Sequence, residues 1–186
     1  MNICKELESE LLSYFKKKNI ENSVKDDELF EIGKILSDYT KYLKFKSKKQ
    51  IPFGRYLVFK NTYCNLQIDI FSNNYVGRIH NHKTWGVLCV LAGALKVTDY
   101  VMLKKNLIQI RSNFLNIGSF SAFKEDNDWH STETFDGDQV LSFHLYGNNF
   151  DLDNGYYFDK NKGIISYTRG ELRSLAVLNP YFDFIT

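Results

Sequence analysis

Apolar positions recur at helical spacing over the first 45 residues. One stripe consists of Ile3, Leu7, Leu11, Leu12 and Phe15. A second segment begins at Asp26 with an acidic first turn, which the helix dipole favours, and its stripe consists of Leu29, Phe30, Ile32, Leu36, Tyr39 and Leu43. The pattern predicts a helical segment over residues 1–45 whose apolar stripes pack on the rest of the protein.

From Pro52 onward the spacing changes to short alternating runs separated by Asn-, Asp- and Gly-containing turns. The predicted strands are Arg55–Phe59, Leu66–Phe71, Val87–Leu91, Leu95–Met102, Leu107–Arg111, Ser119–Phe123, Ser131–Phe135, Val140–Tyr146, Tyr156–Asp159 and Gly163–Thr168. Evenly spaced strands without intervening helices are typical of a sandwich or barrel. We expect one domain over 1–186, with a mainly β barrel and C-terminal extension over 52–175.

Composition narrows the class of protein. Hydrophobic residues make up 44% and aromatic residues 16% of the chain, as in a strand-rich globular protein. The net charge of +2 argues against a broad basic surface for nucleic acid. Cys4, Cys64 and Cys89 form no CxxC pair, and no apolar run suggests a signal or membrane segment. We expect a cytoplasmic protein that contacts neither membrane nor nucleic acid.

The most informative stretch contains two of the four histidines, His80 and His82. On a strand, residues i and i+2 point to the same face, so this H-x-H is suited to bind a metal, particularly if His130 approaches from a facing strand. Three imidazoles would leave coordination positions open, and they suit Fe, Zn, Cu or Ni alike. A surface H-x-H without a metal is the alternative.

The fourth histidine lies in an alternating strand. Ser142, His144 and Tyr146 share one face, and Phe143 and Leu145 share the other. The polar face predicts a hydrogen-bonded relay from Ser to His to Tyr, although a strand half exposed to water would alternate in the same way.

Together these features resemble a cupin, a double-stranded β-helix barrel, here with an N-terminal helical segment. The H-x-H and Gly93 match the first cupin motif without its usual Glu, and Trp129-His130 matches the second. The resemblance is more specific to the cysteine dioxygenase family of thiol dioxygenases. The matching stretches are Pro52-Phe53-Gly54-Arg55, Ile79-His80-Asn81-His82, Trp129-His130 and the strand around Ser142-Phe143-His144-Leu145-Tyr146.

The resemblance implies an Fe(II) enzyme that oxidises a small thiol with O2 to a sulfinic acid, as a monomer or weak homo-oligomer. His80, His82 and His130 would hold the iron. Tyr146, His144 and Ser142 would form the catalytic relay, and Arg55 would bind the substrate carboxylate unless it is a rim ion pair. No organic cofactor is implied.

Two departures from the family pattern concern the substrate side. Gly86 occupies the position of the cysteine that crosslinks to the relay tyrosine in mammalian members, so Tyr146 is expected to be uncrosslinked, as in bacterial members. Phe53 replaces a tyrosine found in some relatives. Arg55 resembles the cysteine-preferring branch, whereas Thr84-Trp85-Gly86 resembles the 3-mercaptopropionate branch.

We expect L-cysteine as the substrate, with 3-mercaptopropionate as the alternative; Arg169 and Arg173 are the alternative carboxylate ligands. Two other classes stay open. One is a different cupin enzyme, such as a metal-dependent isomerase or a diketone-cleaving dioxygenase. The other is a non-enzymatic cupin that binds or senses a small ligand.

Overall fold

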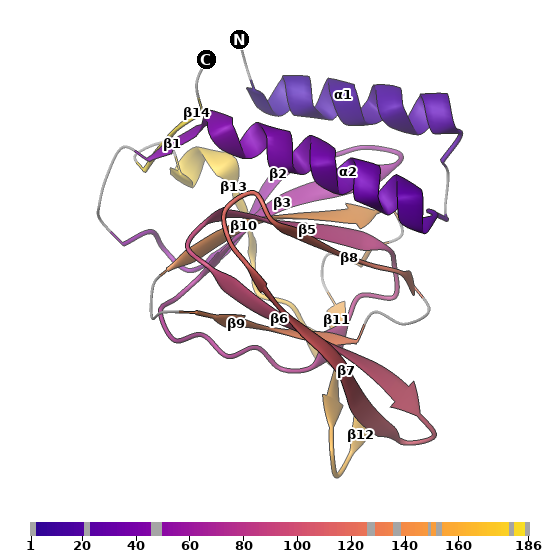
Figure 1. Cartoon of the computed structure of the whole chain (residues 1–186). Helices are drawn as coiled ribbons and strands as arrows, with labels where there is room; N and C mark the ends of the chain where they lie inside the picture. The colour runs from indigo at the N-terminus through magenta and orange to yellow at the C-terminus, as the bar shows by residue number, and fades with distance from the viewer. Residues whose placement is uncertain are drawn as a thin grey trace.

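The computed structural model describes residues 3–20, 23–45, 50–125, 129–135, 139–148, 150–151, 154–178 and 181–184. Two helices, α1 (Ile3–Lys18) and α2 (Asp26–Tyr39), come first. A short 3-10 turn, η1 (Thr40–Tyr42), follows, and strands make up most of the remainder (Figure 1). Among the described residues, no helix is both long and apolar enough to span a membrane.

Two six-stranded sheets face each other and are built mainly from eight consecutive strands. The strands are β3 (Cys64–Phe71), β4 (His80–Asn81), β5 (Gly86–Ala92), β6 (Leu95–Leu103), β7 (Asn106–Leu115), β8 (Phe120–Phe123), β9 (His130–Thr134) and β10 (Val140–Gly147). One sheet contains the order β3-β10-β5-β8 and the other contains β4-β9-β6-β7. This order is that of an eight-stranded jelly roll, the cupin-type double-stranded β-helix. The expected fold class is therefore confirmed.

Further strands extend both sheets. β2 (Gly54–Lys60) lies beside β3 and β13 (Leu172–Ser174) lies beside β2, while the hairpin of β11 (Asn154–Asp159) and β12 (Gly163–Thr168) extends the other sheet beyond β4. All ten predicted strands have counterparts, with ends that differ by at most a few residues. A 3-10 turn, η3 (Leu175–Leu178), precedes the last strand, β14 (Phe182–Phe184).

The predicted helical segment is too long by three residues. Residues Leu43–Phe45 form strand β1, which pairs antiparallel with β14 (Figure 1). This pairing joins the two ends of the chain, so no local pattern could reveal it.

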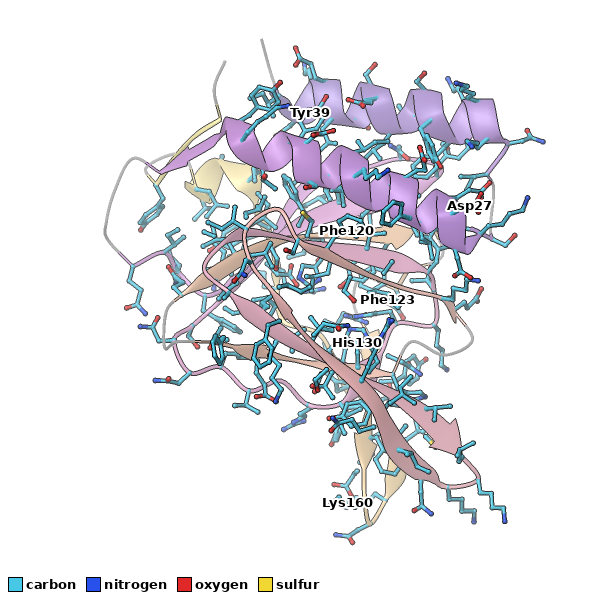
Figure 2. All side chains as sticks on the ribbon, viewed as in Figure 1. Asp27, Tyr39, Phe120, Phe123, His130 and Lys160 are labelled. Atoms are coloured by element: carbon cyan, nitrogen blue, oxygen red, sulfur yellow. The ribbon has the colours of Figure 1, made fainter. Side chains whose placement is uncertain are left out.

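The helices cover the outer face of the sheet that contains β3, β10 and β5 (Figure 1). Four side chains of α1 (Ile3, Leu7, Leu11 and Phe15) are buried, as their spacing predicts. Phe30 is an exception to the predicted stripe, because 52% of its surface is exposed while its ring contacts that of Phe120, with centroids 5.5 Å apart. Figure 2 labels Phe120 beside helix α2. The residue of α2 that is buried against the Phe120 ring is Gly33.

The main hydrophobic core lies between these helices and the sheet, outside the barrel lumen. Leu66, Ile68, Phe143 and Leu145 point into this core with Cys89. Because side chains alternate along a strand, their polar neighbours point into the lumen. This arrangement places Ser142, His144 and Tyr146 on the opposite side of the sheet from the main core.

The turn between β5 and β6 requires a glycine. Gly93 has φ +73, and a Cβ there would lie 2.8 Å from the backbone oxygen of Gln139. Gly93 thus permits the tight turn that takes the chain from the sheet containing β5 to the sheet containing β6.

Candidate metal centre and substrate cavity

Three histidines meet in the lumen. His80 and His130 stand directly opposite each other where β4 pairs with β9, and His82 follows the end of β4. One nitrogen from each ring lies within 4.8 Å of the others. His130 thus comes from a neighbouring strand of the same sheet, and the three-histidine group could hold a metal ion.

Removal from water keeps the imidazoles of His80 and His82 neutral, as metal ligands must be. Loss of water lowers the pKa of both His80 and His82 well below the usual range, and the neighbouring ring His130 acts in the same direction. The Nδ1 atom of His80 donates to the backbone oxygen of Arg78 at 2.8 Å, which leaves Nε2 as the lone-pair nitrogen. Three imidazole nitrogen donors fit a divalent transition metal.

Arg169 imposes the opposite tautomer on His82. Its Nη2 atom lies 3.0 Å from His82 Nδ1, and a guanidinium can only donate, so Nδ1 accepts. A neutral His82 then carries its proton on Nε2. For His82 to join His80 on a metal, either this contact opens or Nε2 loses its proton. Arg169 therefore lines the cavity and also determines which nitrogen of His82 carries the proton.

Aromatic rings enclose the group on two sides. Phe123 stacks on His130 with ring centroids 4.8 Å apart, and Phe150 stacks on Tyr146 at 3.9 Å. The guanidinium of Arg169 lies over the Phe150 ring, 4.5 Å from its centroid. These contacts fix the orientation of Tyr146 beside His82, whose ring centroid is 4.7 Å away.

Gly86 stands directly opposite Tyr146 in the pairing of β5 with β10. A Cβ at this position would lie 2.3 Å from the ring of Phe123. The structure thus has a phenylalanine ring in the space that a side chain at position 86 would need.

The Ser-His-Tyr strand forms a continuous hydrogen-bonded chain. Ser142 Oγ lies 2.9 Å from His144 Nε2, and His144 Nδ1 lies 3.0 Å from the Tyr146 hydroxyl. All three side chains are buried, so the alternative of a strand half exposed to water is wrong. Burial, followed by the charge of Asp69, raises the pKa of Tyr146 well above its usual range, so its hydroxyl keeps its proton.

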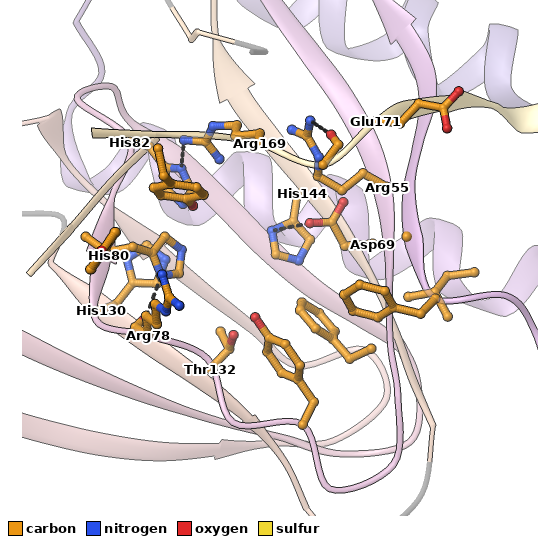
Figure 3. Close-up of a pocket in the computed structure, with 18 of the residues that line it drawn as sticks. Arg55, Asp69, Arg78, His80, His82, His130, Thr132, His144, Arg169 and Glu171 are labelled. Atoms are coloured by element: carbon orange, nitrogen blue, oxygen red, sulfur yellow. Dashed lines mark hydrogen bonds and ion pairs between the residues drawn. The ribbon is translucent and has the colours of Figure 1, made fainter. Parts of the chain in front are cut away.

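A cavity of about 450 Å³ extends from the three histidines towards Arg55 (Figure 3). Its volume falls within the usual range of about 300–1,000 Å³ for small-molecule sites. Arg55 lines the cavity and donates from Nη2 to the backbone oxygen of Gly170. Burial lowers the pKa of Arg55, and the charge of Asp69 opposes this shift.

The alternative arginines also line this cavity but have different neighbours. Arg169 lies against His82, whereas Arg173 donates from Nη1 to the Phe53 backbone oxygen at 3.2 Å. The cavity therefore offers a carboxylate more than one cation, since Arg55, Arg78, Arg169 and Arg173 all line it.

Sequence reasoning missed Asp69. In the stretch Cys64-Asn65-Leu66-Gln67-Ile68-Asp69, polar residues alternate with apolar ones, as they do around His144. Asn65 and Gln67 face the lumen from the same strand and hydrogen-bond to each other at 3.1 Å. The same period-two pattern that indicated the relay would have indicated Asp69.

No protein-family model and no curated protein matches the chain. Among solved structures, KdgF from a Halomonas species is similar, with 16% identity over 58% of this chain and 88% of its own, at a TM-score of 0.44. An RmlC-like cupin family protein from Methanocaldococcus jannaschii has 8% identity over 56% of this chain and 88% of its own, at 0.43. A recombinant oxalate oxidase in complex with glycolate has 14% identity over 55% of this chain and 45% of its own, at 0.41. Such distant similarities carry no inference about residues or reactions.

Proposed function

We propose that this protein is a thiol dioxygenase of the cysteine dioxygenase family, which converts a small carboxylate-bearing thiol and O2 to the sulfinic acid. In this reaction both oxygen atoms of O2 join the sulfur, and no other reductant is consumed. The observation that carries the proposal is the position of the three histidines beside the Ser142-His144-Tyr146 chain.

His80, His82 and His130 would hold Fe(II). Ferrous iron, when bound, supplies the Lewis acidity and redox capacity that the reaction of a thiol with O2 needs. The donor set fits this metal because all three ligands are imidazoles and no cysteine or carboxylate belongs to the group.

Tyr146 would present a hydroxyl proton to the reacting groups. The Asp69 carboxylate lies 3.8 Å from His144 Nδ1, which favours the tautomer with its proton on that nitrogen. His144 Nε2 then accepts from Ser142, and Nδ1 donates to the Tyr146 oxygen. The Tyr146 proton is left to point into the cavity, where it can stabilise developing negative charge.

Arg55 would bind the substrate carboxylate through charge-assisted hydrogen bonds. L-cysteine is our preferred substrate because Arg55 lines the cavity beside the relay. The guanidinium of Arg169 beside His82 supports 3-mercaptopropionate as the second candidate, because it offers a different carboxylate position.

The test is oxygen consumption by iron-loaded protein with L-cysteine, 3-mercaptopropionate and cysteamine, with mass spectrometry of the products. We expect one O2 consumed for each sulfinate formed, with L-cysteine the most efficient substrate. If cysteamine, which has no carboxylate, is the best substrate, the role of Arg55 is wrong. If no thiol is oxidised and purified protein retains no iron, a non-enzymatic ligand-binding cupin is favoured.

A further inference from the structure

Arg169 lies in the segment between β12 and β13, and three contacts hold its side chain against the three-histidine group. Its Nη2 atom lies 3.0 Å from His82 Nδ1, a contact that Figure 3 marks with a dashed line. Its Nε atom donates to the backbone oxygen of Asn154 at 2.6 Å, and its guanidinium lies over the Phe150 ring. These contacts together direct the guanidinium at His82.

The contact with Arg169 uses the one ring lone pair of His82. A neutral imidazole carries a proton on one nitrogen and a lone pair on the other. Because a guanidinium can only donate, the lone pair of His82 lies on Nδ1 and accepts from Arg169. A metal that approaches Nδ1 meets the guanidinium, and a metal that approaches Nε2 meets a proton. While this contact persists, neutral His82 has no lone pair to give to a metal.

His80 has the opposite arrangement, which is the usual one for a metal ligand. A ligating histidine commonly donates its other ring N–H to a carbonyl or carboxylate oxygen. His80 Nδ1 has such a partner in the backbone oxygen of Arg78 at 2.8 Å, so its lone pair lies on Nε2. In His82 the same ring position, Nδ1, faces a donor instead. The structure therefore contains one histidine with the tautomer of a ligand and one whose lone pair is occupied.

We propose that Arg169 competes with the metal for His82, so that metal binding requires the guanidinium to leave this ring. Arg169 is then a positioning residue of the metal site, because it acts through the proton and lone pair of His82. The inference rests on the three-histidine site and applies whichever reaction the metal serves.

Release of His82 requires no change of fold. Arg169 lines the cavity of about 450 Å³, and a Cβ at the neighbouring Gly170 would have no atom within 4 Å. The side chain can therefore rotate into space that already exists. The metal must then replace one charge-assisted hydrogen bond, which is a barrier to affinity rather than to folding.

The experiment compares the metal affinity of the native protein with that of Arg169→Met. Both metal-free proteins are titrated calorimetrically with Co(II), which takes imidazole donors as Fe(II) does. We expect Arg169→Met to bind Co(II) about ten- to hundredfold more tightly, because no charge-assisted hydrogen bond has to be broken. Binding by Arg169→Met alone would support the inference in the same way.

Arg173→Met is the matched control. It removes an equal charge from the same cavity, but Arg173 Nη1 donates to the Phe53 backbone oxygen at 3.2 Å and approaches the Tyr56 hydroxyl at 3.4 Å. Its affinity for Co(II) should stay close to that of the native protein. An equal gain in both variants would show that the metal is opposed by the positive charge of the cavity alone, and competition for His82 would be wrong.

Nitrogen-15 NMR of the native protein gives a second measurement that needs no variant. In metal-free protein His82 should carry its proton on Nε2, with Nδ1 unprotonated, and Zn(II) should shift the Nη signals of Arg169 as the guanidinium leaves. A proton on Nδ1 before metal is added, or Arg169 signals unchanged by bound Zn(II), contradicts the inference. So does unchanged affinity in Arg169→Met, or no Co(II) binding by either protein. Failure to oxidise any thiol overturns the proposed function and leaves these results unaffected.

Discussion

At the scale of single residues, the lumen combines neutral imidazoles with a protonated phenol. Loss of water lowers the pKa of His80 and His82 and raises that of Tyr146. The same burial therefore prepares both the metal ligands and the hydrogen-bond donor beside them.

The role of Tyr146 as a donor predicts a specific loss. Tyr146→Phe should retain iron and slow thiol oxidation about tenfold to a thousandfold, because one hydrogen bond to developing charge is removed. Oxygen consumption and iron content of the same preparation check this. Tyr157→Phe, at another tyrosine lining the cavity, should have a much smaller effect; loss of iron from the Tyr146 variant would contradict the assigned role.

The role of His130 predicts loss of metal without loss of fold. His130→Ala removes one of three donors and should weaken Fe(II) binding at least about hundredfold, more than is typical for a residue that only orients a ligand. Calorimetry and circular dichroism measure the two properties. His144→Gln removes another histidine of the same cavity and should keep the metal, so equal losses in both variants would rule out the three-histidine site.

Most of the candidate residues could be predicted, because they follow the two-residue period of strands. The pattern around His80 and around Ser142 placed their side chains correctly in the lumen. The alternation in Cys64–Asp69 also places Asp69 on the lumen face, but the chemical role of a single acidic residue there depends on its neighbours in space. The contact of Arg169 with His82 joins residues 87 positions apart, which no local pattern contains.

At the scale of elements, the sheet of β3, β10 and β5 separates two environments. Its outer face packs against α2, and its inner face carries Asp69 and His144. The sequence predicted β3 and β10 from their alternation of polar and apolar residues, and β5 from a short continuous apolar run. Strand β4 is only two residues long, so the position of His80, and of His82 just after it, depends on pairing with β9 and β11.

The contact between α2 and β8 predicts that replacing Gly33 of the helix with alanine destabilises the protein. Gly33→Ala would place a Cβ 2.3 Å from the Phe120 ring, which must then move. We expect a loss of about 1–3 kcal/mol from overpacking, despite the roughly 1 kcal/mol that alanine gains over glycine in a helix. Urea unfolding measures the change. Asp38→Ala, at an exposed position of the same helix, should be neutral or stabilising; equal stability of the two variants would contradict close packing at Gly33.

At the scale of the whole molecule, the buried histidines make folding depend on pH. The pKa values of His80, His82 and His144 are lowered in the folded protein, whereas the unfolded chain takes up these protons near pH 6.5. Below that pH the unfolded state binds more protons, so stability falls as the pH falls.

Metal-free protein should therefore lose about 1.4 kcal/mol per pH unit for each histidine that stays neutral, between about pH 6.5 and the lowered pKa values. Urea unfolding at pH 5 to 7.5 measures this slope. His144→Gln should reduce this slope by the contribution of one histidine, about 1.4 kcal/mol per pH unit. If the free energy of unfolding does not change across this range, the histidines take up protons in the folded protein as readily as in the unfolded chain, and the prediction is wrong.

The fold class could be predicted because many short strands without intervening helices allow few arrangements. The pairing of β1 with β14 could not, since it depends on contacts between the two ends of the chain. Organisation as one domain, the cytoplasmic location, and action as a monomer or weak homo-oligomer without nucleic acid or membrane stay predictions.

The placement of the core outside the barrel has a consequence for how this protein can change. Leu66, Ile68, Phe143 and Leu145 pack the sheet against the helices, while Asp69, His144 and Tyr146 on the same strands line the cavity. Evolution can therefore exchange a lumen residue for another of similar volume and alter which molecule the cavity accepts, while the layer that keeps the chain folded is left untouched.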